Sequence, residues 1–235
     1  MKKELVTFVF IPLFFNALLI GLYFSGIEGL QQLVAPTIKG LSSNVWREFG
    51  LLEQLQNIFL LVVVVILFLS AINKKNTLDG VFFMAGALFF LFLLLEEIDY
   101  GIHFYELFTA ENTGIEVRNW HNQKIDGEQH VKKFKKIMDL LMFVLFIVLP
   151  LSNKKIPIQF IKNISPSRWF IIGFVISIAS SNVAHLLDTQ NMGVINSIDG
   201  NLSGNISEFR ELTNYYFFML YAFQLRKLKS LLKSS

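Results

Sequence analysis

Hydrophobic residues in this chain come in long unbroken blocks rather than in the periodic stripes of a water-soluble helix or strand. The block from 58 to 69 contains no polar residue. Apolar segments that reach about 20 residues with their flanks are long enough to cross a bilayer as helices. We therefore predict an all-α, polytopic integral membrane bundle of about six helices, with residues 1–235 forming one membrane domain. The predicted spans are 5–24, 51–72, 81–98, 137–151, 169–187 and 209–225.

The first and last of these spans differ from the others. Met-Lys-Lys precedes the first, as in a signal peptide, but no small-x-small cleavage site follows it, so we predict an uncleaved helix. The last span is the least apolar, because Glu211, Thr213, Asn214 and three tyrosines interrupt it.

Composition supports a membrane location and excludes several kinds of chemistry. Hydrophobic residues make up 53% of the chain and charged residues only 17%, against about 25% charged in average soluble proteins. The absence of cysteine excludes a disulfide framework, a thiolate metal site and a cysteine nucleophile. The net charge of +3 comes from lysines that flank the apolar blocks, which is typical of membrane topology signals and not of nucleic-acid binding.

The distribution of Lys and Arg over alternate connections predicts the orientation of the chain. More of these residues lie on the side of the two termini than on the opposite side. Since cytoplasmic loops are enriched in Lys and Arg, both termini are predicted to be cytoplasmic, in a cell membrane. The lysine cluster at 132–136 is on the opposite side and weakens this bias.

The third apolar block ends abruptly in a group of ionisable residues, Glu96, Glu97, Asp99 and His103. Carboxylates at or inside a bilayer boundary are costly, so a protein that keeps them there generally uses them. On a continuous helix, Glu96, Asp99 and His103 stand at i, i+3 and i+7 and share one face. The alternative is a plain membrane boundary, where charged residues resume.

Span counting places the polar ends of four spans at one membrane face. Besides the third span, these ends are the start of the second and sixth spans and the end of the fifth. Their polar residues are Glu53 and Asn57 in the second span, Ser181, His185 and Asp188 in the fifth, and Glu208 and Glu211 in the sixth. Ordinary alternatives are an interhelical hydrogen bond for His185 and Asp188, and a favourable helix-dipole position for Glu208.

A connection of about 35 residues, 99–133, follows the third span on the same side. Structureless loops of that length are usually functional or disordered. Its sequence Asn119-Trp120-His121-Asn122 combines an interfacial anchor with polar groups that could bind a ligand, although His121 could also be an ordinary solvated histidine.

Imidazoles and carboxylates are the ligands that zinc prefers when thiolates are absent. A zinc ion held by two or three histidines and a carboxylate would lower the pKa of its bound water to about 7 and permit hydrolysis. No HExxH or other tight metal spacing is present. The candidate ligands are His103, His121, His185, Asp99 and Asp188, the candidate catalytic carboxylates are Glu53, Glu96 and Glu97, and the remaining polar lining is Asn57, Asn122, Ser181, Glu208 and Glu211.

Short islands between about 46 and 215 resemble an uncharacterised group of bacterial multi-span membrane proteins. The segment 96–101, Glu-Glu-Ile-Asp-Tyr-Gly, is similar to that group's Glu-Glu-Ile-Ser-Trp-Gly signature and departs from it at Asp99 and Tyr100. The segment 119–122 matches an Asn-x-His-Asn loop, and Glu208 and Glu211 match a late Glu-rich helix start. The resemblance implies that these positions matter, and it implies no reaction.

A more distant analogy is the superfamily of alkaline ceramidases and progestin-receptor-like hydrolases. Those proteins have seven spans and a His/Asp/Ser zinc site in the membrane, and this chain has similar residue types. It lacks their paired HxxxH and has six predicted spans, so the analogy is one of chemistry rather than homology.

Three functions from different classes remain open. The first is a membrane-embedded, metal-dependent hydrolase or transferase that acts on a lipid-like substrate reached from the bilayer. The second is a cation- or proton-coupled transporter or channel, for which polar residues should continue through the middle of the membrane. The third is a structural or sensory membrane protein, in which the acidic residues would face bulk water singly.

Overall fold

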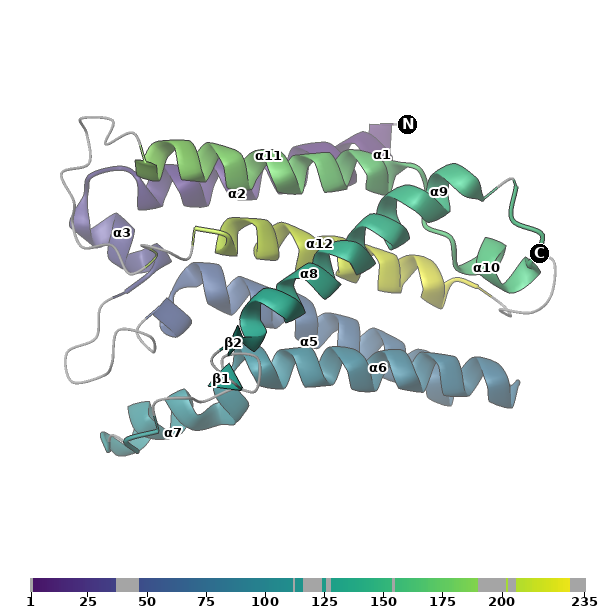
Figure 1. The fold of residues 1–235 in the computed structure, drawn as a ribbon, viewed down its shortest axis with the longest axis horizontal. Coiled ribbons are helices and arrows are strands. Elements are labelled where there is room, and N and C mark those ends of the chain that lie inside the picture. Colours follow the sequence, from purple (N-terminus) through teal and green to yellow (C-terminus); the bar gives the residue numbers. More distant parts are fainter. Residues whose placement is uncertain are drawn as a thin grey trace.

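The computed structural model describes residues 2–36, 47–111, 113–115, 124–125, 128–153, 155–189, 202 and 206–228, and these are almost entirely helical (Figure 1). The long helices are α1–η1–α2 (Lys2–Leu5, Val6–Phe10 and Ile11–Tyr23), α5 (Leu51–Ile72), α6 (Thr77–Glu97), α8–η5–α9 (His130–Phe143, Val144–Val148 and Leu149–Ser152), α11 (Trp169–Thr189) and α12 (Glu208–Arg226). The short helices are α3 (Glu28–Val34), η2 (Arg47–Phe49), η3 (Asp99–Gly101), α7 (Ile102–Thr109) and α10 (Gln159–Ile164). A two-residue antiparallel ladder pairs β1 (Lys124–Ile125) with β2 (Glu128–Gln129).

Four helices are long and apolar enough to cross a membrane: Lys2–Tyr23, Leu51–Ile72, Thr77–Glu97 and Trp169–Asp188. They coincide with the first, second, third and fifth predicted spans. The fourth predicted span forms a shorter apolar helix, Ile137–Ser152. The sixth forms α12, which does not reach the same apolar character. The helical fold class is confirmed, and membrane insertion with a count of six stays a prediction.

The most polar long helix, α12, lies in the middle of the bundle (Figure 1). It packs against α5 on one side and α11 on the other, and it also contacts α2. Most of its length is buried, including its aromatic residues Phe209, Tyr215, Phe217 and Tyr221. A helix enclosed by other helices does not face lipid, so it can carry Glu, Thr, Asn and Tyr that a peripheral span could not.

Two π-helical segments interrupt the peripheral helices, and each stands just before a proline. Val6–Phe10 precedes Pro12, and Val144–Val148 precedes Pro150. A proline inside a helix removes one N–H donor, and its ring collides with the carbonyl four residues earlier, which lies inside each π segment. Widening the helix to i→i+5 hydrogen bonds gives that carbonyl room. The two prolines therefore explain both irregularities.

Aromatic side chains join the helices at the core. Phe170 on α11 lies 4.8 Å from Phe8 and 4.9 Å from Phe146, measured between ring centroids, and Phe217 on α12 lies 6.2 Å from both Phe8 and Phe170. Edge-to-face and offset arrangements at these separations contribute beyond their buried area. The cluster ties the N-terminal helix, α11, α12 and the helix that contains η5 into one body.

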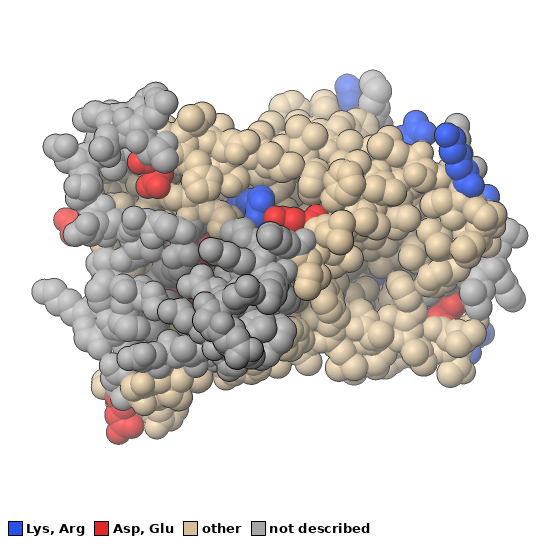
Figure 2. Space-filling view, in the orientation of Figure 1, with Lys and Arg blue, Asp and Glu red and all other residues tan. Residues whose placement is uncertain are grey.

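The charged and apolar surfaces are separated along the molecule. α1 begins and α12 ends on the right-hand side of Figure 1. Figure 2 shows most of the blue Lys and Arg atoms on that side, and one blue group next to red atoms near the centre of an otherwise largely uncharged surface. Many Leu, Ile, Val and Phe side chains on the outer helices are exposed. Exposed apolar area of this extent is compatible with a membrane location.

Gly173 sets the distance between α11 and α12. A Cβ at this position would lie 2.4 Å from ring atoms of Phe217. We expect Gly173→Ala to lower the free energy of unfolding by about 1–3 kcal/mol, the usual range for an overpacked core. The measurement is the unfolding transition of the purified protein in detergent. Gly21→Ala on α2 is the matched control, because nothing lies within 4 Å of its Cβ, and equal stability of the two variants would contradict the close contact.

Candidate functional site

The polar helix ends gather at the end of the bundle opposite the end of α12 (Figure 1). α5 and α12 begin there, and α6 and α11 end there. This is the arrangement that alternation of the spans predicts.

The expected continuous helix through the acidic motif is wrong. α6 ends at Glu97, and the next helix, α7, begins at Ile102. Between them the φ angles of Asp99, Tyr100 and Gly101 are +49°, +53° and +85°. A left-handed conformation costs roughly 1–2 kcal/mol for a residue with a Cβ and little for glycine. The turn also places a helix inside the connection that was predicted to lack secondary structure.

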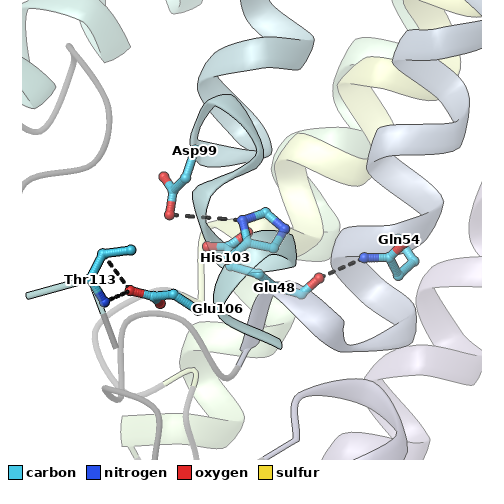
Figure 3. Close-up of polar contacts among 6 residues, drawn as sticks. All are labelled: Glu48, Gln54, Asp99, His103, Glu106 and Thr113. Atoms are coloured by element: carbon cyan, nitrogen blue, oxygen red, sulfur yellow. Dashed lines mark hydrogen bonds and ion pairs between the residues drawn. The ribbon is translucent and has the colours of Figure 1, made fainter. Parts of the chain in front are cut away.

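The left-handed turn brings Asp99 and His103 together by a route different from the predicted shared helix face. The Nδ1 atom of His103 lies 3.9 Å from Oδ2 of Asp99 (Figure 3). The histidine is fully buried and Asp99 is 5% exposed. The rings of Phe49 and Phe104 flank the imidazole, with centroids 5.2 and 4.2 Å away. An imidazole and a carboxylate are thus paired away from solvent, with two aromatic rings against the imidazole.

The two glutamates before the turn point to different tyrosines. The Tyr100 hydroxyl donates a hydrogen bond to the buried carboxylate of Glu96, and this bond raises the pKa of Tyr100 to about 12. The hydroxyl of Tyr215 on α12 donates to Glu97 Oε1 over 2.5 Å. Glu97 therefore links α6 to the central helix, while Glu96 stabilises the turn that follows it.

Two further buried glutamates lie near His103: Glu106, which was not predicted as a site residue, and Glu48, which the sequence places with Glu53 at the start of the second span. Glu106 on α7 is 1% exposed, and its Oε1 accepts hydrogen bonds from the Thr113 N–H at 2.9 Å and from the Thr113 hydroxyl at 2.6 Å (Figure 3). Glu48 is also buried, next to Phe49, and its backbone carbonyl accepts from Gln54 Nε2 at 2.7 Å. The i, i+3 spacing of His103 and Glu106 was a signal for one polar helix face, had the helix been recognised.

A second polar group joins the starts of α5 and α12. Gln56, which sequence analysis did not single out, is fully buried and donates from Nε2 to the backbone carbonyl of Glu208 at 3.1 Å and to its carboxylate at 3.3 Å. Glu53 is buried one turn earlier on α5. Among the described residues, neither polar atom of the Asn57 amide has a hydrogen-bond partner, although both are shielded from solvent. Glu211 lies on the same helix as Glu208, half-buried and within electrostatic reach of Tyr215.

The residues of the fifth predicted span do not join this site. His185 and Asp188 have exposed side chains, whereas Ser181 is buried. Asp188 acts electrostatically on Tyr23 of α2, and Figure 1 draws the end of α11 and α7 on opposite sides of α12 and α5. The structure therefore separates His185 and Asp188 from His103, because α11 packs on the far side of the central helix.

The described part of the chain contains no group of three or more His, Asp or Glu side chains placed to hold a metal ion. The residues that it describes do not fit a zinc centre, and we derive no metal-assisted step from them. His121 and Asn122 lie outside the described residues, so the part that they would take stays a prediction.

Comparisons with protein-family models, with curated proteins and with solved structures found no match for this chain. The resemblance to the bacterial membrane-protein group therefore stays a prediction that rests on the short motifs alone.

The positive φ angle of Asp99 predicts which residues position 99 accepts without loss of stability. Asn enters the left-handed region far more readily than a β-branched residue does. We expect the free energy of unfolding of Asp99→Asn to stay close to that of the wild type. The free energy of unfolding of Asp99→Val should be lower than that of Asp99→Asn by about 1–2 kcal/mol. Unfolding in detergent, followed by circular dichroism, measures both. A valine variant as stable as the asparagine variant would contradict the turn.

Proposed function

We propose that this chain is an integral membrane enzyme whose Asp99–His103 pair acts as a general acid–base group on a lipid-like substrate reached from the bilayer. The observation that carries the proposal is the buried contact between His103 Nδ1 and Asp99 Oδ2, at 3.9 Å, at the end of a membrane-length helix. Histidine has an ordinary pKa of about 6.5 and serves both as acid and as base near neutral pH. A structural or sensory role is less well supported, because Glu53, Glu96 and Glu106 are buried instead of facing water singly.

The two members of the pair have different roles in this proposal. His103 is the group that takes or gives the proton, through its Nε2 atom. Asp99 accepts from the Nδ1 side, holds the tautomer that leaves Nε2 basic, and stabilises the imidazolium when it forms. For these roles, the distance between His103 Nδ1 and Asp99 Oδ2 must shorten from 3.9 Å to hydrogen-bond length during the reaction. Catalytic hydrogen bonds are often long in the absence of substrate.

The surroundings of the pair favour a substrate from the membrane. Phe49 and Phe104 flank the imidazole and keep it out of bulk water, which strengthens the electrostatic interaction between the pair. A substrate reaches His103 when one of these rings moves aside. An apolar chain that lies along the exposed surface of α6 has its polar head at the level of the α6–α7 turn. The polar part of such a molecule would lie near Glu96 and Glu106, and it would have to displace Tyr100 or Thr113 to bind their carboxylates.

Turnover of native lipids tests the enzyme proposal. The purified protein is placed in vesicles made from lipids of its native cell, and lipid species are followed by mass spectrometry. We expect one amphiphile to disappear and a product to form, with His103→Asn slowing the reaction roughly 10²–10⁴-fold, as loss of a general acid–base group does. Asp99→Asn should slow it as well, while retaining the fold.

His185→Asn is the matched control for the turnover experiment. This histidine is exposed and lies apart from the site, so its substitution should leave the rate unchanged. Wild-type protein that alters no lipid would contradict the enzyme proposal. If His103→Asn and His185→Asn slowed the reaction to the same extent, the proposed role of His103 would be contradicted.

Ion or proton transport is the second candidate, and one observation favours it. Polar contacts continue inward along α12: Asn16 Nδ2 on α2 donates to the Thr213 hydroxyl at 2.8 Å, and the Ser177 hydroxyl on α11 donates to Asn214 Oδ1 at 2.5 Å. These groups, together with Glu97, Glu208 and Glu211, would form a proton or cation path along the central helix. Residues 62–68 of α5 and 85–92 of α6 carry no polar side chain, and this weakens the case for transport through the middle of these helices.

A flux measurement distinguishes this second candidate from the first. Vesicles that contain a pH-sensitive dye and the purified protein are given a membrane potential. If the protein conducts protons, the interior of the vesicles should acidify more slowly with Thr213→Val or Asn214→Leu than with the wild type. Each substitution removes a polar group from the proposed path. The matched control is Thr109→Val, an exposed threonine on α7. Wild-type vesicles no leakier than protein-free vesicles would contradict transport.

A further inference from the structure

The amphipathic helix α7 is inverted relative to a helix of a water-soluble protein. Its buried residues are His103 and Glu106, which are polar. Its exposed large hydrophobic residues are Phe108, at 82%, Tyr105, at 51%, and Leu107, at 41%, and Thr109 at its end is exposed as well. The ionisable side chains of α7 face inward, while Tyr105 and Phe108 face outward and Phe104 packs on the imidazole. Water alone would not orient a helix in this way.

We propose that α7 is an interfacial helix whose outer face, formed by Tyr105, Leu107 and Phe108, inserts into the lipid headgroup zone. The partner is the lipid bilayer itself, and this assignment does not depend on any catalytic role of His103. Helices of this kind bury an apolar face several ångströms into the boundary between headgroups and acyl chains.

The position of α7 supports lipid as the occupant of its outer face. It follows α6 directly, and α6 is one of the four membrane-length helices. Leu88 and Phe92 on α6 and Tyr100 in the turn are exposed, whereas residues 93–99 between them are buried or half-buried. Figure 2 shows uncharged surface along the lower edge of the molecule as far as the end that carries α7. α7 thus begins five residues after the end of a membrane-length helix, at the level where the boundary of a bilayer is expected.

The side chain of Tyr105 has the contacts expected at a membrane interface. Its hydroxyl lies 3.4 Å from Glu111 Oε2, and its ring is half exposed. An aromatic body in the apolar zone with a polar tip towards water is the arrangement that enriches tyrosine at both faces of a bilayer. Glu111, an exposed carboxylate just past the end of α7, marks where the water phase begins.

The backbone at both ends of α7 permits this placement. Left-handed residues stand at both ends, with Asp99, Tyr100 and Gly101 before it and Ala110 after it. These turns set the direction of α7 independently of α6, so that the polar face closes over the acid–histidine pair while the aromatic face stays outside. The strain is tolerable where burial of the outer face in lipid repays part of its cost.

Tryptophan fluorescence of the full chain in vesicles tests the proposal. The native Trp46, Trp120 and Trp169 are replaced by Phe, and one tryptophan is introduced as Phe108→Trp, a mild change at an exposed position. In phosphatidylcholine–phosphatidylglycerol vesicles we expect blue-shifted emission, strong quenching by lipids brominated near the headgroup, and weak quenching by aqueous acrylamide.

Glu111→Trp in the same background is the matched control, and it should show red-shifted emission and strong acrylamide quenching. A variant that retains only Trp169, at the start of a span, reports whether the protein has inserted and folded. If Phe108→Trp is as accessible to acrylamide as Glu111→Trp while Trp169 is quenched by lipid, the proposal is overturned. Protection from both quenchers, with a dimer captured by cross-linking, would also overturn it by assigning the face to a second copy of the chain.

Discussion

The cost of exposing polar groups to hydrocarbon organises this molecule around α12. That helix carries carboxylates, Thr213, Asn214 and several tyrosines, and each unsatisfied polar group inside a bilayer costs several kcal/mol or so. Enclosure by α2, α5 and α11 buries most of the helix, and hydrogen bonds join several of its polar side chains to these neighbours. Thr213, for example, donates to the Phe209 carbonyl and accepts from Asn16. The apolar outer helices form the shell that makes a polar centre possible.

The candidate site follows from the same constraint at one end of the bundle. Glu96, Asp99, His103 and Glu106 are buried there at the junction of α6 and α7. The junction needs two non-glycine residues in the left-handed region, so local backbone preference has been overridden to bring Asp99 against His103. Strain of this kind persists where the surrounding packing imposes it, and it is concentrated at functional sites. Packing of Phe49 and Phe104 on the imidazole and the Tyr100–Glu96 hydrogen bond supply that support.

Inversion of α7 extends this picture to the membrane surface. A helix with His103 and Glu106 inside and Phe108 outside makes sense when one side of it meets protein polar groups and the other meets lipid. In the two proposals, the same short segment covers the candidate site and lies at the bilayer boundary. The proposed lipid chemistry depends on the buried Asp99–His103 pair. The proposed interfacial position of α7 depends on its exposed aromatic residues, so either can hold without the other.

The sequence by itself determined the apolar helices and the end of the bundle at which the polar residues gather. Hydropathy is a local property, and the alternation of spans carries the ends of α5, α6, α11 and α12 to one side without any knowledge of packing. Tertiary structure alone decided which polar residues meet. The sequence placed Asp99 and His103 on one regular helix and suggested His185 and Asp188 as their neighbours. In the fold, a left-handed turn makes the first contact, and α12 and α5 stand between α7 and the end of α11. Backbone handedness at one turn and the order of helices around a centre depend on long-range packing, and no local pattern of residues encodes them.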